Sequence, residues 1–228
     1  HNIKNIWFKK DGVIIKNDVR PLNENLDSIP FPDKELFEKY ILFKDQYIAM
    51  TARKCPFDCF YCSNNYLQKI YRGKGRFLSR RSPDNVIEEL RGAKERYSPR
   101  EIIFFDDVFT SDISWLKEFL KRYENEIAIP YRCLSHPVFL SEDMVSLLKK
   151  TNCLCIQLGV QTINENTRRE IINRHETNDK LKEVFDLCDR YHLKYNIDHI
   201  FGLPFESEKD YIKAAEFYIN RKYCTEIN

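Results

Sequence analysis

Three cysteines, Cys55, Cys59 and Cys62, are the residues whose type and spacing point most directly to chemistry. Because three and then two residues separate them, their thiolates lie on one tight loop and can bind three irons of a four-iron cluster. The fourth iron would keep an open coordination position, where a small molecule can bind and be polarised. Electron-transfer ferredoxins instead supply a fourth cysteine with a different spacing. The motif therefore predicts a catalytic iron–sulfur site.

A structural zinc site is the alternative interpretation of the same cysteines. Such a site closes with four ligands, so a histidine or a distant cysteine would have to complete it. The candidate histidines, none at zinc-finger spacing, are His136, His175, His192 and His199. Cys153, Cys155 and Cys188 lie among apolar residues and are expected to be small core residues, not parts of a disulfide framework.

The elements that must position this loop are alternating strands and helices. Apolar runs predict strands at Tyr47–Met50, Ile102–Phe105, Ile127–Leu134, Cys153–Leu158 and Tyr195–Phe201. Ser82 before Pro83, Ser141, and the pair Ser207 and Asp210 are typical of helix starts. Five strand–helix units in order predict a parallel sheet with right-handed crossovers, either doubly wound or a partial or full barrel.

Two further expectations concern burial and the place of the chemistry. The continuous apolar run Ile102–Phe105 is typical of a strand that is buried on both faces. Barrel enzymes place their reacting residues at the carboxyl ends of several strands. The cysteine loop directly follows the first strand, as that rule requires.

Residues 1–46 have a different pattern. Apolar segments on either side of Asp11-Gly12 predict a small β-hairpin. A linker follows and ends in a short helix from Asp33 to Tyr40. The prolines of this linker are Pro21, Pro30 and Pro32.

Length and composition limit the remaining possibilities. The chain has 228 residues, with 37 basic and 35 acidic side chains and a formal net charge of +2. Its 43% hydrophobic content is enough for a packed core and excludes a disordered chain. No apolar run approaches the roughly 18 residues that a membrane span needs. The first residues, His1 to Lys4, contain no apolar signal region, so secretion is not expected. The cysteine spacing fits a reducing compartment, so we expect a cytoplasmic protein.

The segment Thr51–Cys62 resembles the signature of the radical S-adenosylmethionine (SAM) enzymes, and the aromatic Tyr61 belongs to that pattern. Residues 47–228 resemble the core of this superfamily through five of its six strand–helix units. The segments Arg80–Pro83 and Phe105–Phe109 are similar to the branch that carries a cobalamin-binding domain. Residues 1–46 resemble the hairpin and linker that join such a preceding domain to the core.

This resemblance implies a partial (β/α)6 TIM-like barrel, with the chain ending at Thr225–Asn228 before a sixth strand. The three cysteines would bind a [4Fe-4S] cluster, and SAM would chelate its fourth iron. One electron would cleave SAM to methionine and a 5′-deoxyadenosyl radical. Flavodoxin or ferredoxin would be the electron donor. The substrate would be an unidentified small molecule, with methyl transfer, ring rearrangement or hydrogen abstraction all open.

Cobalamin is implied only through a domain outside this sequence. A base-off cobalamin site usually offers a histidine in an Asp-x-His-x-x-Gly context, and this sequence has no such pattern. The 228 residues alone are therefore not expected to bind cobalamin tightly.

The resemblance also assigns SAM contacts. Asp106 and Asp107 occupy the position of a Gly-Gly-Glu motif that contacts the SAM ammonium, although adjacent acids could instead cap the next helix. Gln161 and Arg174 resemble the ribose and carboxylate contacts of the oxygen-independent coproporphyrinogen oxidases. The later residues Asp198 and Gly202 match the fifth strand of that subgroup, where they would bind the ribose and admit the nucleoside.

One stretch supports a different class of protein. Residues 63–81 carry basic side chains interleaved with aromatic ones and no acid, a pattern that can follow a nucleic acid. The alternative function is therefore a non-catalytic RNA-binding module stabilised by zinc or an iron–sulfur group. The nearly neutral overall charge favours the enzyme and makes nucleic acid an unlikely partner.

Overall fold

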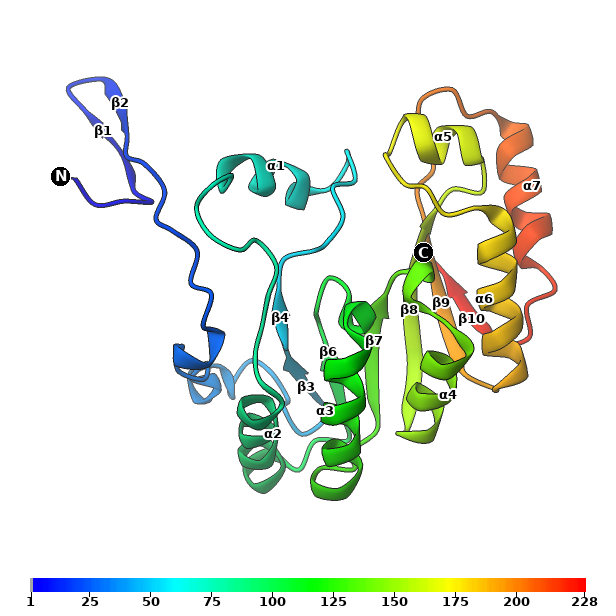
Figure 1. Cartoon of the computed structure of the whole chain (residues 1–228), viewed down its shortest axis with the longest axis horizontal. Coiled ribbons are helices and arrows are strands. Elements are labelled where there is room, and N and C mark those ends of the chain that lie inside the picture. Colours follow the sequence, from blue (N-terminus) through cyan, green and yellow to red (C-terminus); the bar gives the residue numbers. More distant parts are fainter. Residues whose placement is uncertain (1) are drawn as a thin grey trace.

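The computed structural model describes residues 2–228, and most of them belong to one parallel sheet with its helices (Figure 1). The six strands lie in the order β10-β9-β8-β7-β6-β3. Their bounds are β3 Gln46–Ala49, β6 Glu101–Phe104, β7 Tyr131–Ser135, β8 Cys153–Gln161, β9 Lys194–His199 and β10 Cys224–Ile227. The helices are α1 Ser63–Ile70, α2 Pro83–Tyr97, α3 Ile113–Glu126, α4 Glu142–Lys150, α5 Glu165–Glu170, α6 Asn178–Arg190 and α7 Glu208–Tyr218.

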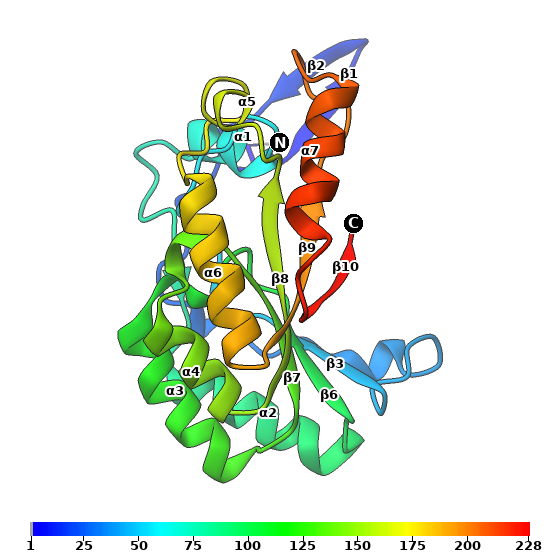
Figure 2. The same cartoon turned by 90° about the vertical axis from the view of Figure 1, so that its right-hand side faces the viewer.

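Helices α2, α3, α4 and α6 cover one face of the sheet, and the other face remains open (Figure 2). On β6, Ile102 and Phe104 are fully buried under these helices. Ile103 is only partly buried, and Phe105, just after the strand, is 56% exposed. The prediction that this run is buried on both faces is therefore wrong, because the strands do not curl far enough to enclose it.

The predicted helix starts are confirmed by side-chain caps. The Ser82 hydroxyl accepts a hydrogen bond from the Asn85 amide, and the Ser141 hydroxyl accepts one from the Met144 amide. Ser207 and Asp210 form the predicted reciprocal capping box at the start of α7. Each cap satisfies amide donors that the first helical turn leaves free.

The third strand starts later than its apolar pattern predicts. Ile127 still belongs to the end of α3, where its amide donates to the Tyr123 carbonyl. Ala128 then turns the chain with a φ of 56°. As a result β7 begins at Tyr131, and the predicted strand start at Ile127 is wrong.

The predicted partial barrel is confirmed, but one detail of it is corrected. The last residues do form a sixth strand, β10, which pairs in parallel with β9. The amide of Asn228 donates to the Ile197 carbonyl at 2.8 Å. This strand could not be recognised in the sequence, because its side chains are largely exposed and form no apolar run. The sheet ends at β3 on one side and β10 on the other, so it does not close.

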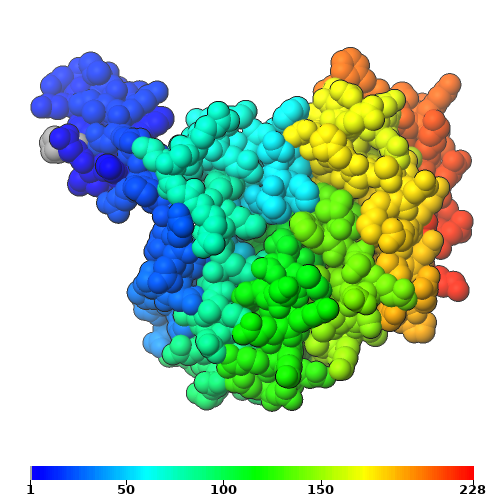
Figure 3. Space-filling view, viewed as in Figure 1, coloured from blue at the N-terminus to red at the C-terminus, as the bar shows by residue number. Residues whose placement is uncertain are grey.

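The N-terminal hairpin stands apart from the sheet (Figures 1 and 3). Strands β1 (Trp7–Lys10) and β2 (Val13–Lys16) pair antiparallel across the predicted Asp11-Gly12 turn, whose two residues have φ values of 49° and 81°. The helix expected at Asp33–Tyr40 is shorter, a single 3₁₀ turn at Lys34–Phe37 capped by Asp33.

A buried charge cluster fixes the linker to the sheet. The ammonium of Lys34 lies 3.4 Å from the Glu89 carboxylate on α2 and also donates to the Ile48 carbonyl. Arg81 pairs with the other oxygen of Glu89, and the Tyr47 hydroxyl donates to Glu89 at 3.0 Å. Burial lowers the pKa of Lys34, while the pairing with Glu89 opposes that shift.

Among the described residues, no helix has the length and apolar character to cross a bilayer.

Candidate active site

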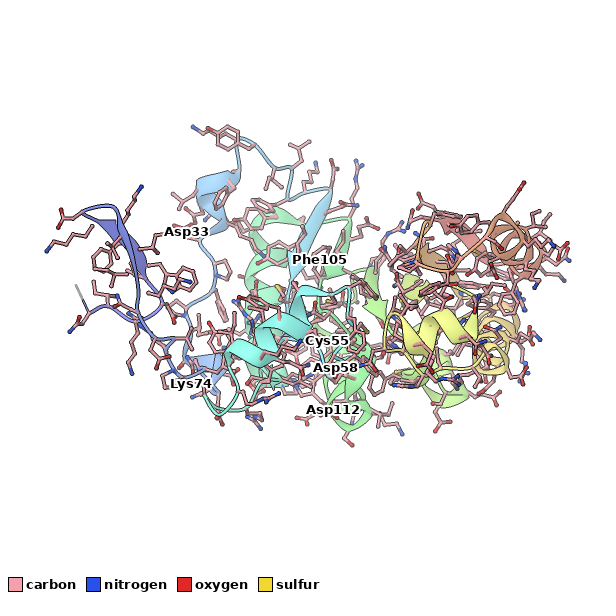
Figure 4. The ribbon with its side chains drawn as sticks, turned by 90° about the horizontal axis from the view of Figure 1, so that it is seen from above. Asp33, Cys55, Asp58, Lys74, Phe105 and Asp112 are labelled. Carbon is pink, nitrogen blue, oxygen red and sulfur yellow. The ribbon has the colours of Figure 1, made fainter. Side chains whose placement is uncertain are left out.

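The cysteine loop and the carboxyl ends of the strands enclose one cavity of about 150 Å³. In the view from above, Cys55 and Asp58 lie together beside α1, over the middle of the molecule (Figure 4). The predicted site residues that line the cavity are Cys55, Cys59, Tyr61, Cys62, Asp107, Gln161, Arg174 and Asp198. Two others, Asp106 and Gly202, do not line it. The structure thus brings most of the predicted residues together, although they are far apart in sequence.

Backbone contacts hold the cysteine loop against a distant segment. The loop begins at the end of the short strand β4 (Ala52–Arg53), where Lys54 has a φ of 75°. The amide of Phe60 donates to the Ile172 carbonyl at 3.1 Å. Asn173 donates from its side chain to the Asp58 carboxylate at 2.8 Å. These bonds place the loop beside the residues that follow α5.

The thiols receive hydrogen bonds that suit a sulfur ligand. The amide of Phe57 donates to Cys55 Sγ at 3.5 Å, and Asn64 Nδ2 donates to Cys62 Sγ at 3.8 Å. Burial raises the pKa of Cys55 to about 11, and the nearby Asp107 carboxylate adds to the shift. A thiol that coordinates a metal is deprotonated, so a bound cation would favour the thiolate form of Cys55 over the protonated thiol.

The arrangement of these donors fits a cluster. Within residues 2–228, no three His, Cys, Asp or Glu side chains converge as a single metal ion would require. Three thiols spread around one cavity instead match a polynuclear group, because each thiolate then binds a different iron. Nitrogen donors from Phe57 and Asn64 next to the sulfurs are of the kind that tune such clusters.

Asp106 and Asp107 have different surroundings although they are adjacent. Asp106 is fully buried and accepts hydrogen bonds from the Thr51 amide at 2.8 Å and from the Ala52 amide. Burial raises the pKa of Asp106 to about 6, and the nearby Arg80 guanidinium opposes that shift. Asp106 therefore binds the backbone between β3 and the cysteine loop. Of the two aspartates, Asp107 is the one that lines the cavity.

Arg174 is fixed by two acceptors in the cavity wall. Its Nε donates to Glu176 Oε1 at 2.7 Å, and its Nη2 donates to the Gly159 carbonyl at 2.5 Å. A Cβ on Gly159 would lie 2.6 Å from Gln161 Nε2 and 3.3 Å from Arg174 Nη1. Because Gly159 has no side chain, the side chains of Gln161 and Arg174 can both pack against the backbone of β8 at this position.

Asp198 lies at the end of β9, with partners for one of its oxygens. Gln157 Nε2 donates to Asp198 Oδ1 at 2.8 Å, and Asn228 Nδ2 donates to it at 3.2 Å. Gln161 ends β8 with a φ of 69°. Gly202 is exposed in the next loop, where its amide donates to the Tyr211 hydroxyl at 2.9 Å.

Several residues of this cavity and its wall are not indicated by the sequence, and three of them carry polar groups near Arg174 and Asp198. His136 and Gln157 line the cavity, and Glu176 pairs with Arg174 behind it. Gln157 had a detectable signal, since a polar residue interrupts the apolar strand Cys153–Leu158. The sequence indicates His136 only as a possible zinc ligand. Glu176 follows Arg174 by two residues and carried no signal of burial.

His136 is expected to make the protein less stable in mild acid. Burial lowers its pKa to about 2, and the cationic Arg174 and Arg168 add to the shift. Below pH 6.5 the unfolded chain therefore binds a proton on this residue that the folded protein does not bind. By pH 5 the loss of unfolding free energy is about 2 kcal/mol. Urea denaturation of wild type and His136→Asn from pH 7.5 to pH 5 measures the difference, and parallel curves would exclude this residue as its source.

A larger cavity, about 440 Å³, lies away from the cysteines between the linker and β3. Its lining is mainly apolar and comes from the segment between Leu26 and Phe43 and from β3 and β4, with Arg81 and Glu89 at its wall. No cysteine lines it, so its size does not make it the reaction site.

Of the six basic side chains of segment 63–81, Lys74, Arg80 and Arg81 are held by contacts within the protein, and Lys69, Arg72 and Arg76 are exposed. Lys74 pairs with Asp18 at 2.6 Å, and Arg81 pairs with Glu89. Arg80 donates to Thr51 and to Ser111 at 2.9 Å. These bonds fix the linker and the start of α2, so half of the basic side chains on which the RNA-binding alternative depends are already engaged within the protein.

Residues 50–218 match the sequence profile of the Radical SAM superfamily. Because this match covers most of the chain, the protein belongs to the radical SAM superfamily, and the resemblance seen in the segment Thr51–Cys62 is confirmed. An uncharacterized methyltransferase of Pyrococcus horikoshii is 26% identical over 219 residues, which are 94% of this chain and 46% of the relative.

Two solved structures have the same fold. The radical SAM methyltransferase TsrM from Kitasatospora setae, solved with tryptophan and a SAM analogue, superposes with a TM-score of 0.78 at 13% identity. That match covers 100% of this chain and 46% of TsrM. The cobalamin-dependent enzyme OxsB, solved with aqua-cobalamin and SAM, gives 0.78 at 12% identity, over 99% of this chain and 33% of OxsB. The chain thus spans less than half the length of these relatives.

Proposed function

We propose that this chain is the core of a radical SAM enzyme, with a [4Fe-4S] cluster on Cys55, Cys59 and Cys62 and SAM in the adjoining cavity. The observation that carries this proposal is that three thiols and the polar ends of neighbouring strands line one cavity. When bound, the reduced cluster and SAM supply a 5′-deoxyadenosyl radical through one-electron cleavage of a C–S bond.

The residues of the cavity have separate roles in binding SAM. Asp107 would attract the ammonium of the methionyl group, and Arg174 would donate to its carboxylate. Gln161 and Asp198 would bind the ribose hydroxyls of the nucleoside. Asp106 shapes the loop from behind, and Gly202 makes no contact in this arrangement.

The reaction class proposed for the full-length enzyme is methyl transfer with cobalamin. Support comes from three relatives. The Pyrococcus horikoshii protein and TsrM are named as methyltransferases, and OxsB was solved with aqua-cobalamin and SAM. The corrin would be bound with residues outside the 228 described by this sequence. The substrate would be a small molecule at the open mouth of the half-barrel.

An external protein such as flavodoxin or ferredoxin would deliver the electron. Phe60 and Tyr61 lie on the cysteine loop with 61% and 46% of their surface exposed, so a small redox protein can approach there. All eight cysteines are free thiols, which fits a reducing cytoplasm.

Anaerobic reconstitution with iron and sulfide tests the proposed function. We expect a four-iron spectrum whose EPR signal after reduction changes when SAM is added. One tightly bound zinc and no response to SAM would instead support a metal-stabilised binding module.

Replacement of Asp198 by asparagine is expected to weaken SAM binding without destroying the cluster. The variant loses one or two hydrogen bonds to a charged acceptor, worth about 1.5–3 kcal/mol each, so affinity should fall by roughly one to two orders of magnitude. SAM titration followed by the EPR signal measures the affinity, and thermal melting without SAM measures stability. Unchanged affinity with a large fall in melting temperature would make Asp198 a structural residue that holds Gln157 and Asn228.

A further inference from the structure

His136 has a donor that the protein itself does not use. Three buried polar side-chain atoms have no hydrogen-bond partner within the described residues, namely His136 Nε2, Tyr195 OH and Glu206 Oε2. Of these three residues, only His136 lines the cavity beside the cysteines. An unpaired buried donor is costly, so its place in a ligand cavity calls for an acceptor on the ligand.

The orientation of the His136 ring is fixed from two sides. Its Nδ1 accepts a hydrogen bond from the Val138 amide at 3.3 Å, as the cap of the 3₁₀ turn Pro137–Phe139. Its face stacks on Phe57, with ring centroids 4.0 Å apart and planes at 23°. Only 5% of the residue is exposed. Because Nδ1 is an acceptor, the proton of the neutral ring lies on Nε2.

The neighbours of this donor indicate which part of SAM it faces. β7 lies between β6, which leads to Asp107, and β8, which carries Gly159 next to Arg174. His136 Nε2 lies 3.7 Å from Glu176 Oε2, beyond hydrogen-bond distance, and Glu176 is the partner of Arg174. A methionyl group held between Asp107 and Arg174 would therefore lie beside His136, with its carboxylate at the Arg174 end.

We propose that His136 is a SAM-binding residue whose Nε2–H donates to the carboxylate of the methionyl group. The inference rests on the proposed function and adds a contact to it. Arg174 is already paired with Glu176, so its charge is largely compensated before SAM binds. A neutral donor at His136 strengthens the hold on the carboxylate without adding a charge that would repel the ammonium and sulfonium groups.

Two amide substitutions separate this role from a structural one. His136→Asn places an oxygen near the position of Nδ1, so it retains the cap to Val138 but removes the Nε2 donor. His136→Gln places an amide nitrogen near the position of Nε2, so it retains the donor and loses the cap. We expect His136→Asn to weaken SAM binding by about 10- to 100-fold and His136→Gln to bind SAM close to wild type. Thermal melting without SAM should rank the two variants in the opposite order.

The binding experiment uses reconstituted protein and two ligands. SAM affinity is measured from the cluster EPR signal, and 5′-methylthioadenosine, which lacks the amino acid moiety, is measured by competition. A loss for SAM alone in His136→Asn supports the contact with the carboxylate. Equal losses for both ligands, or unchanged SAM affinity, would overturn it.

Two further controls keep the result interpretable. If His136→Asn fails to assemble the cluster, His136→Phe removes the same donor and keeps the stacking on Phe57, and the same expectation applies to it. If wild type binds the cluster but shows no SAM-dependent signal, the proposed function has failed and not only the role of His136.

Discussion

Replacement of Cys59 by alanine is expected to abolish assembly of the four-iron cluster. The protein offers three thiols at this cavity, and without Cys59 only two of the four irons keep a protein ligand. Iron and sulfide content after anaerobic reconstitution should fall to background, and the charge-transfer absorption of the cluster should be lost. Cys55→Ala and Cys62→Ala should behave in the same way.

Cys188→Ala is the matched control for this experiment. Cys188 is fully buried in α6 within the main core, away from the cavity. Its replacement removes one sulfur from a packed site and is expected to lower stability by about 1–2 kcal/mol, with the cluster intact. A full-occupancy four-iron Mössbauer signal in Cys59→Ala would refute the ligand assignment.

Replacement of Arg168 by methionine is expected to cause a large loss of stability. The Arg168 side chain is fully buried in α5. Its Nε donates to the Thr162 carbonyl at 2.9 Å, its Nη1 to the Glu176 carbonyl at 2.6 Å, and its Nη2 to Asn178 Oδ1 at 2.7 Å. Methionine fills much of the volume but leaves these acceptors unpaired, which costs about 3–5 kcal/mol.

The measurement is the free energy of unfolding in urea, with the neighbouring Arg169→Met as the control. Arg169 is exposed and pairs only with the exposed Glu170 and Asn166, so its replacement should change stability by no more than about 0.5 kcal/mol. SAM binding by the surviving Arg168→Met protein should also weaken, because the Thr162 and Glu176 carbonyls flank the segment that carries Arg174. Similar losses in the two variants would show that the buried network does not support this region.

The elements and the cysteine site could be predicted because their signals are local. The helix starts depend on Ser82 and Ser141 and on amides in the same turn. The spacing from Cys55 to Cys62 fits within a single loop. The resemblance to the superfamily is visible in the same short segment.

The remaining features depend on contacts that no short segment contains. Asp106 and Asp107 look equivalent in sequence, and only the register between β3 and the end of β6 turns Asp106 toward Thr51. The unpaired donor of His136 results from the distance to Glu176, forty residues later in the chain. The sixth strand was hidden because β10 is an exposed edge strand, where polar residues are tolerated as well as apolar ones.

The attachment of the linker has a consequence for how the protein behaves in a crowded solution. β3 is an outermost strand, and the carbonyls of Ala49 and of Asp45, just before the strand, accept hydrogen bonds from the β6 side. The Ile48 carbonyl points the other way, toward an edge that could recruit a strand from another molecule, and it accepts the ammonium of Lys34 instead. Lysine and proline are residues with which natural proteins block exposed sheet edges. The linker, which carries Pro30, Pro32 and Lys34, thus blocks the free edge of β3 and hinders edge-to-edge pairing with the sheet of another molecule.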